Sequence, residues 1–479
     1  MWWLLLLIPA ALLVFLCVIL IRASRFKPLR QERPSSAPVE VDGARAAESL
    51  RRMIQCRTVS SYDKAAIDEA EFEKFRSLLA ERYPGIHSAC TLDHIGDNGL
   101  LYRWKGRSEA RPTVLMSHYD VVPANAQSWS KPPFEGIIED GVLWGRGTLD
   151  TKSTLCAVME AVESWINKGF VPENDLYMAF AGDEEVNGAT APAIVEELHR
   201  RGVTPALVVD EGGAVVENVF PGVERPCDLV GIAEKGMMNL TLSAESAGGH
   251  ASTPPPHTLL GKLAKAVVAM EAHPFPGRLT RPAAEMFDTL GRHSTLLYRV
   301  IFANLWCFRG LLDRICRKTG GELNALMRTT VAVTQAQGSA APNVLPPRAS
   351  IGVNLRLIGG DTPESALEYL RGVIGDGDIR LTDTLSNPPS AVSETGDASW
   401  AVLRSAIEQT WPEAIVSPYL MVACSDSRHY CRISSHVYRF SAMALSAEDR
   451  AMIHANDERL SLDKLTQCVE FYVRLIAQC

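Results

Sequence analysis

The hydrophobic positions of the chain follow two patterns, which predict different elements. Residues 2–21 form one apolar run without a charged side chain. From about residue 42, short apolar runs alternate with stretches in which apolar residues recur every three or four positions. Strands that are buried on both faces have continuous apolar runs, whereas helices that cover a sheet have a helical period. The pattern therefore predicts a layered α/β body that follows an apolar amino-terminal helix.

Three short apolar runs, at residues 113–116, 176–181 and 206–209, are predicted to be strands of a mostly parallel sheet. Each is followed directly by side chains that can bind a metal ion. These side chains are His118 and Asp120, Glu184 and Glu185, and Asp210 and Glu211. Open parallel sheets place their sites at the carboxyl ends of their strands, so we expect the three ends to meet in one crevice.

Residues 236–385 are predicted to form a second, smaller domain. The expected elements are a strand at 237–244, a helix at 259–272, strands at 328–334 and 350–357, a helix at 363–374 and a strand at 379–381. This β-α-β-β-α-β order is that of a ferredoxin-like α+β sandwich. Because the carboxyl-terminal segment contributes a further candidate ligand, His454, we expect the domain to be an insertion. Residues 45–235 and 386–479 then form the two parts of the catalytic domain.

Residues 1–22 are predicted to be a single-pass transmembrane anchor, followed by a linker at 23–44. Twenty helical residues span roughly the 30 Å hydrocarbon layer of a bilayer. A cleaved signal peptide is the alternative, but it would begin with positive charge and have a shorter apolar region. Five basic residues follow the apolar run and place the body in the cytoplasm by the positive-inside rule, although the side stays open; they are Arg22, Arg25, Lys27, Arg30 and Arg33.

The composition of the 479 residues narrows the function. Hydrophobic residues make up 47% and charged residues 22%, as in ordinary globular proteins. The net charge of −8 lacks the basic footprint that nucleic-acid binding needs, so we expect no nucleic-acid partner. The eleven cysteines include no CxxC pair, which argues against a Cys-rich zinc module. A metal ion would therefore be bound by histidines and carboxylates.

A pair of zinc ions accounts for five of these residues together. With Asp150 as a bridge, one ion would take His118 and Asp210, and the other Glu185 and His454. Catalytic zinc combines three protein ligands with an open position for water. The two ions, three carboxylates and one hydroxide would also balance in charge. Cobalt and manganese stay open as alternatives to zinc, and each residue taken singly also fits an ordinary structural role.

Two further carboxylates receive distinct roles in this hypothesis. Asp120 lies two residues after His118 and is placed to orient its imidazole ring. Glu184 precedes a predicted ligand without being one. It would accept a proton from the attacking water and pass it to the leaving nitrogen.

Six motifs, SHYDVVP, GRGTLD, GDEEVNG, VVDEGG, GGHAS and IHANDE, occur in this order along the chain. They resemble the di-zinc metallopeptidases of the glutamate carboxypeptidase, aminoacylase and carboxypeptidase S group. The resemblance is closest to carboxypeptidase S and the N-fatty-acyl-amino-acid synthase/hydrolase, and it extends from about residue 45 to the end. One departure is that Thr151-Lys152-Ser153 follows the bridging aspartate, where the family commonly has Asp-Lys-Gly.

The resemblance also implies roles for residues of the inserted domain, which would act as a lid. His250 would stabilise the oxyanion of the tetrahedral intermediate, and Asn343 would assist it. Arg356 would bind the carboxylate of the substrate, with Arg428 as a second candidate for that role.

These observations predict a zinc-dependent hydrolase that cleaves the amide bond to a carboxyl-terminal amino acid. Its substrate would be a peptide or an N-acyl amino acid. The alternative from another class is an inactive metal-binding membrane receptor or scaffold. The apolar segment 296–315 could line an acyl pocket, enter a membrane surface, fill the lid core or mediate a subunit contact. A homodimer through the lid is compatible with the two-domain architecture.

Overall fold

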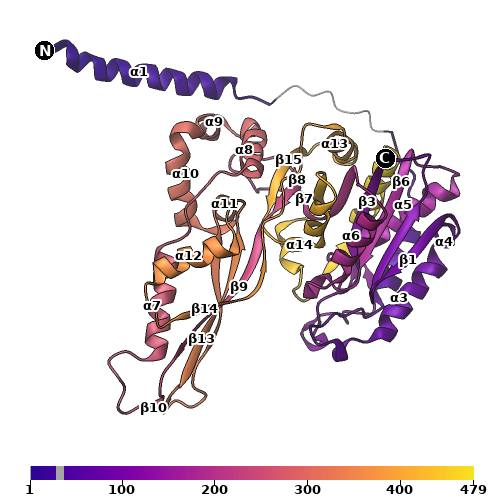
Figure 1. The fold of residues 1–479 in the computed structure, drawn as a ribbon. Coiled ribbons are helices and arrows are strands. Elements are labelled where there is room, and N and C mark those ends of the chain that lie inside the picture. The colour runs from indigo at the N-terminus through magenta and orange to yellow at the C-terminus, as the bar shows by residue number, and fades with distance from the viewer. Residues whose placement is uncertain (1, 29–36) are drawn as a thin grey trace.

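The computed structural model describes residues 2–28 and 37–479 (Figure 1). Part of the predicted linker, with Arg30 and Arg33, lies outside the described residues. The body has one large central sheet with helices on both faces, and a second, smaller sheet beside it.

The central sheet has eight strands in the order β1-β2-β6-β3-β7-β16-β8-β15. Strands β6, β3, β7 and β16 run parallel to one another, and antiparallel pairs occur towards both edges, so the predicted parallel sheet is mixed. The strands are β1 (Cys90–Ile95), β2 (Gly99–Trp104), β3 (Ser108–His118), β6 (Asn174–Ala181), β7 (Leu207–Val216), β8 (Cys227–Glu234), β15 (Ile415–Met421) and β16 (Val437–Ala444).

Alternate side chains of the strands enter two hydrophobic cores. Val114 and Met116 of β3 pack with α6 (Thr190–Arg200), whereas Leu115 between them enters the larger core. This alternation is the period of two that a strand imposes. The helices that contribute to the larger core include α2 (Gly43–Ile54), α3 (Glu69–Arg82), α4 (Pro84–Ala89), α5 (Lys152–Asn167), α13 (Ala398–Thr410) and α15 (Leu462–Ile476).

A small three-stranded sheet and a short helix complete the catalytic part of the body. The sheet has the order β17-β5-β4 and joins residues far apart in the sequence. The elements are β4 (Ile137–Glu139), β5 (Val142–Trp144), α14 (Ala447–Met452) and β17 (Arg459–Ser461).

The second sheet is antiparallel, with the order β11-β13-β9-β14. Its elements follow one another in the β-α-β-β-α-β order that we expected. They are β9 (Gly236–Glu245), α7 (Leu259–Ala272), β11 (Thr330–Gln337), β13 (Arg348–Leu357), α12 (Pro363–Ile374) and β14 (Arg380–Asn387). Helices α7 and α12 share a separate hydrophobic core with this sheet. A short pairing of β10 (Gly249–His250) with β12 (Val344–Leu345) lies at the tip of the domain (Figure 1).

Four helices within residues 236–385 pack in the larger core of the central sheet and not in the core of the second sheet. They are α8 (Arg281–His293), α9 (Leu296–Phe302), α10 (Leu305–Thr319) and α11 (Gly321–Met327). Phe287 of α8, Phe302 of α9 and Leu312 of α10 belong to that larger core. The inserted segment therefore contributes to both cores, although its sequence position predicted one domain.

The amino-terminal helix α1 (Trp2–Arg25) extends three residues beyond the predicted anchor. Within the described residues, its stretch Leu7–Arg25 is long and apolar enough to cross a membrane. A signal sequence has the same length and composition, so this observation fits both an anchor and a signal.

A buried ion pair joins the central sheet to the loops around the crevice. Arg439 of β16 and Glu234 of β8 are fully buried, with Arg439 Nε 3.0 Å from a Glu234 carboxylate oxygen. The same carboxylate accepts a hydrogen bond from the backbone N–H of Ser425. The hydrogen bond from Ser425 to Glu234 thus holds the loop after β15, and Arg439 compensates the charge of the Glu234 carboxylate.

We expect Arg439→Met to destabilise the fold, because it leaves Glu234 buried without its cation. Removal of one partner of a buried pair typically costs about 3–5 kcal/mol. Urea unfolding of the purified chain measures the effect. Lys64→Met is the control, because Lys64 and Asp97 form an exposed ion pair. Loss of this pair should leave the midpoint of urea unfolding almost unchanged. Equal shifts for both variants would contradict this role of Arg439.

Candidate active site

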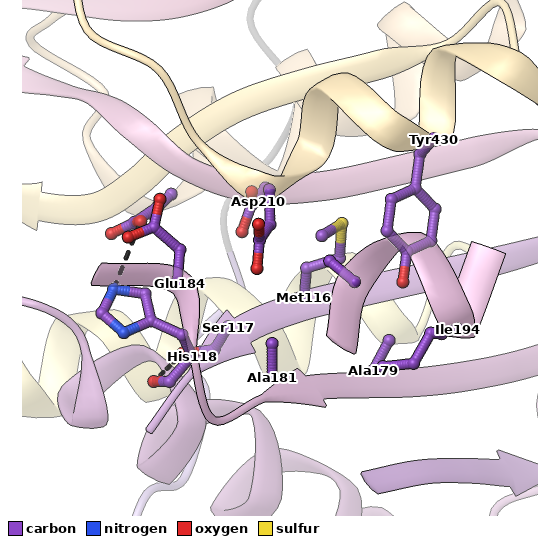
Figure 2. Close-up of a pocket in the computed structure, with 12 residues that line it drawn as sticks. Met116, Ser117, His118, Ala179, Ala181, Glu184, Ile194, Asp210 and Tyr430 are labelled. Carbon is purple, nitrogen blue, oxygen red and sulfur yellow. Dashed lines mark hydrogen bonds and ion pairs between the residues drawn. The ribbon is translucent and has the colours of Figure 1, made fainter. Parts of the chain in front are cut away.

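The carboxyl ends of β3, β6 and β7 lie at one edge of the central sheet and carry the predicted cluster. The parallel register pairs His118 of β3 with Ala181 of β6, and Leu115 of β3 with Val209 of β7. The residues that follow these ends therefore meet, as the sequence predicted. Figure 2 shows His118 and Glu184 together at one end of a pocket, with Asp210 further along and Tyr430 at the other end.

His118 is buried and surrounded by carboxylates. Its Nε2 lies 3.0 Å from Asp150 Oδ1 and 3.4 Å from Glu211 Oε1. Its Nδ1 lies 3.0 Å from the backbone oxygen of Asp120 and 3.3 Å from Asp120 Oδ1. The ring is thus held from one side by Asp120, and its other nitrogen faces the acidic cluster.

The Asp150 carboxylate lies between two histidines. Its Oδ1 contacts His118, and its Oδ2 lies 2.8 Å from His454 Nε2. His454 Nε2 also lies 3.2 Å from Glu185 Oε2. His454 comes from the loop between α14 and β17, about 300 residues after Asp150 in the sequence, and its side chain is 52% exposed. The cluster therefore opens to solvent on the side of His454.

Asp120 fixes the two glutamates relative to His118. Its side chain is fully buried, and its two oxygens accept hydrogen bonds from the backbone N–H groups of Glu184 and Glu185, each at 3.1 Å. These glutamates begin the 3₁₀ turn η3 (Glu184–Val186). One carboxylate thereby sets the positions of a predicted ligand, a predicted base and an imidazole ring.

The structure separates the neighbouring carboxylates of Asp210 and Glu211. In the part of the chain that the structure describes, two groups of possible metal donors have ligand atoms within 4.8 Å of one another, and Asp210 is in neither. One group is His118, Asp150 and Glu185, and the other is His118, Glu184 and Glu211. Asp210 Oδ2 instead accepts a hydrogen bond from the backbone N–H of Ser427 at 3.1 Å. The assignment of Asp210 as a metal ligand stays a prediction, and the sequence DEGG alone does not show which of the two adjacent carboxylates faces His118.

The cluster has an excess of negative charge. Burial and the charge of Asp150 raise the pKa of Glu211 to about 8. Burial raises the pKa of Glu184 well above its usual range, and the charges of Asp426 and Glu211 add to this effect. Hydrogen bonds to Asp150 and Glu185 raise the pKa of His454 to about 10. Protons are thus attracted to a site that carries too few positive charges.

These donors fit divalent cations. Imidazole nitrogens and carboxylate oxygens are ligands of zinc, cobalt and manganese. Glu185 Oε1 is buried without a hydrogen-bond partner, on a carboxylate whose other oxygen faces His454. A buried acceptor without a partner is costly, and a cation between these groups would satisfy it.

A further carboxylate, Glu458, supports the loop that carries Asp150. It is fully buried and accepts hydrogen bonds from the backbone N–H groups of Gly147, Leu149 and Asp150. Arg146 Nη1 donates to the same carboxylate at 2.7 Å. Sequence reasoning missed this role, although Glu458 ends the IHANDE motif that was singled out. The peptide bond between Asp150 and Thr151 is cis, although Thr151-Lys152-Ser153 replaces the Asp-Lys-Gly that commonly follows the aspartate in the family.

The two predicted carboxylate-binding arginines lie near the crevice but contact protein groups. Arg356 of β13 reaches across to the catalytic part, where its Nη1 lies 3.3 Å from Cys424 Sγ. Arg428, in the 3₁₀ segment η4 (Asp426–Arg432), donates to the backbone oxygen of Ser425 at 2.6 Å and to Asn187. Through these two contacts Arg428 connects the loop after Glu185 to η4. Its Nε is buried without a hydrogen-bond partner.

The structure does not bring His250 and Asn343 to the cluster. His250 is in β10 at the tip of the inserted domain, away from the sheet edge that carries His118 (Figure 1). Its side chain is exposed, with Nδ1 2.7 Å from Ser252 Oγ. The backbone oxygen of Asn343 accepts a hydrogen bond from Ala251, so these two predicted residues lie together.

Solved structures share this fold at low sequence identity. The M20 family metallo-carboxypeptidase Sso-CP2 from Sulfolobus solfataricus matches with a TM-score of 0.67 and 14% identity, over 90% of this chain and 98% of that one. Human carnosine dipeptidase 1 matches with a TM-score of 0.65 and 13% identity, over 91% of this chain and 96% of that one. At these identities the likeness shows the fold alone.

Sequence comparison shows the family. A probable carboxypeptidase S-like 2 of Dictyostelium discoideum is 36% identical over 90% of this chain and 84% of its own length. The N-fatty-acyl-amino acid synthase/hydrolase PM20D1 of Homo sapiens is 32% identical over 90% of this chain and 86% of its own length. The sequence profile of peptidase family M20/M25/M40 matches residues 114–478. The chain therefore belongs to this peptidase family and is a hydrolytic enzyme.

Proposed function

We propose that the cluster binds two divalent cations, with zinc as the first candidate, and that the Asp150 carboxylate bridges them. The observation that carries this proposal is that Asp150 lies between His118 and His454, with one oxygen towards each imidazole. Glu185 completes the His454 side. On the His118 side we propose Glu211 in place of the predicted Asp210, because Glu211 faces the imidazole and Asp210 faces the N–H of Ser427.

Glu184 is proposed to move the proton of the reaction. When bound, the cations would lower the pKa of water and polarise the substrate carbonyl. Glu184 lines the pocket beside His118, and Asp120 holds its backbone. Its raised pKa suits a group that accepts a proton from water and then donates it to the departing nitrogen.

The proposed reaction is hydrolysis of the amide bond to a carboxyl-terminal amino acid. The relatives named as carboxypeptidase S-like enzymes and as N-fatty-acyl-amino acid synthase/hydrolases support a peptide or an N-acyl amino acid as the substrate. Arg356 is proposed to bind the free carboxylate, since it reaches from the inserted domain to Cys424, two residues before the pocket-lining Asp426. The intact Glu184 and the full donor set favour this function over an inactive metal-binding receptor.

The inserted domain is proposed to act as a lid. In this structure β10 is far from the cluster, so His250 and Asn343 would reach the substrate through a movement of the domain or from the lid of a second copy in a homodimer. Domain closure of this kind excludes water from a reacting substrate. The helix α1 is proposed to be retained as a single-pass membrane anchor, with a cleaved signal peptide as the alternative.

Glu184→Gln should retain the metal ions and lower turnover by about 10²–10⁴-fold, the usual contribution of a general acid–base group. Glu185→Gln is the matched neighbour and should lose metal, because it removes a proposed ligand. Metal content by mass spectrometry and hydrolysis of an acylated amino acid measure the two effects. Metal loss in Glu184→Gln would refute its assignment as the base.

Glu211→Gln should weaken metal binding more than Asp210→Asn. Loss of an outer partner of a metal ligand typically costs about 10–100-fold in affinity, and loss of a direct ligand should cost more. An asparagine at 210 still accepts the hydrogen bond from Ser427 through its amide oxygen. Titration of the metal-free variants with zinc compares them. A larger loss in Asp210→Asn would restore Asp210 as the ligand.

Removal of the metal ions with a chelator should abolish hydrolysis, and zinc, cobalt or manganese should restore it. The restored enzyme is then assayed on N-acyl amino acids and on unblocked dipeptides. Faster cleavage of the acylated compounds identifies an N-acyl-amino-acid hydrolase, and the reverse identifies a peptidase. Hydrolysis that survives complete metal removal would refute the metal-dependent mechanism.

A further inference from the structure

Helices α9 and α10 expose large apolar side chains next to α1. With α1 in place, Leu297 is 72% exposed, Trp306 60% and Leu296 56%, and Tyr298 is exposed as well. We call these four residues the docking face. Soluble monomers rarely keep a contiguous group of large apolar side chains in water, so we asked what covers this one.

The docking face is continuous with the amino-terminal helix. The ring of Phe15 in α1 makes an edge contact with the ring of Trp306, at 5.9 Å between centroids. Asn304 is fully buried and links α1 to Trp306. Its Nδ2 donates to the backbone oxygen of Ile19 in α1, and its Oδ1 accepts from Trp306 Nε1. Figure 1 shows α1 projecting from the body beside α9 and the start of α10.

The end of α1 is also fixed to the body. Arg22 Nε donates to the backbone oxygen of Ala303 at the end of α9. After the helix, Phe26 lies under the guanidinium group of Arg292 of α8, at 4.6 Å from its ring centroid. The last turns of α1 therefore pack on α9, and Phe26, directly after the helix, packs on α8.

The contact with Phe15 gives the depth of Trp306. Seven residues separate Phe15 from Arg22, which is about 10 Å along a helix axis. If α1 crosses a bilayer with Arg22 at its boundary, Phe15 lies within the apolar layer, and the indole of Trp306 lies beside it. Interfacial helices bury their apolar side chains about 5–10 Å below the boundary between head groups and acyl chains, which is close to the depth that this contact gives Trp306.

The charges around the docking face match an anionic lipid surface. Helix α10 exposes four cationic side chains: Arg309 follows Trp306 closely, and Arg314, Arg317 and Lys318 lie in the last turns, where they share a surface hollow with Glu271 of α7. The one acidic residue in its sequence, Asp313, is bound to Arg328. Apolar residues flanked by cations on a helix favour the interface of membranes that contain anionic lipids.

We propose that the docking face enters the lipid–water interface of an anionic bilayer beside α1, so that α9 and the start of α10 hold the catalytic body against the membrane. This proposal rests on the anchor part of the proposed function and not on the hydrolytic reaction. It assigns the exposed side of segment 296–315 to a lipid surface, whereas Phe302 and Leu312 of the same segment pack in the larger core.

Lipid photocrosslinking in the full-length chain tests the proposal. Leu297, Trp306 or Val268 is replaced by p-benzoylphenylalanine, and each protein is reconstituted into vesicles of phosphatidylcholine with phosphatidylserine. Val268 is the matched control, because it is apolar, 64% exposed and in α7 of the same inserted segment, away from α1. Unchanged hydrolysis of a soluble substrate shows that each variant is folded.

We expect the yield of lipid adducts at Leu297 and Trp306 to exceed that at Val268 by at least about fivefold, and to fall without phosphatidylserine, as for an interfacial helix. Equal yields at all three positions would overturn the proposal. So would adducts between Leu297 and a second copy of the chain, which would identify a subunit contact. Carbonate washing reports on α1 separately: a chain that leaves the membrane would refute the anchor without affecting the hydrolysis assays.

Discussion

The crowding of carboxylates at the carboxyl edge of the central sheet is the constraint on which the site depends. Asp150, Glu184, Glu185 and Glu211 surround two histidines, and their partial burial limits the screening of their charges by water. Such an arrangement is stable only with compensating positive charge, which protons supply in part and divalent cations supply more fully. Burial raises the pKa of Glu184, and the charges of Asp426 and Glu211 add to this effect, which suits the proton transfer proposed for this residue.

A layer of buried polar groups holds this crowded cluster in place. Asp120 fixes the turn that carries the two glutamates, and Glu458 fixes the loop that carries Asp150. Glu234, paired with Arg439, fixes the loop before η4, whose Ser427 then binds Asp210. Each support uses a carboxylate that accepts backbone N–H groups, because backbone donors point in directions that the fold already determines. The positions of the reactive groups thus depend on buried carboxylates at strand ends and in the adjoining loops.

The inserted segment links this centre to two other surfaces. Its antiparallel sheet places Arg356 near the crevice while its tip holds His250 and Asn343 away from it. Its helices α8 to α10 pack on the central core and receive the end of α1. A single insertion therefore combines the proposed lid with helices that pack on the central core next to the proposed membrane anchor.

The sequence by itself determined the α/β body, the β-α-β-β-α-β order of the second sheet and the identity of most residues in the cluster. It did so because apolar periodicity reports burial, and because parallel strands bring their carboxyl ends to one edge. It also placed Asp120 beside His118 through a spacing of two residues. Only the tertiary structure decided that Glu211 and not Asp210 faces His118, that Glu458 supports Asp150, and that helices α8 to α11 belong to the larger core. These features depend on the direction of each side chain and on contacts between segments up to about 300 residues apart, and no local pattern of polarity encodes such directions.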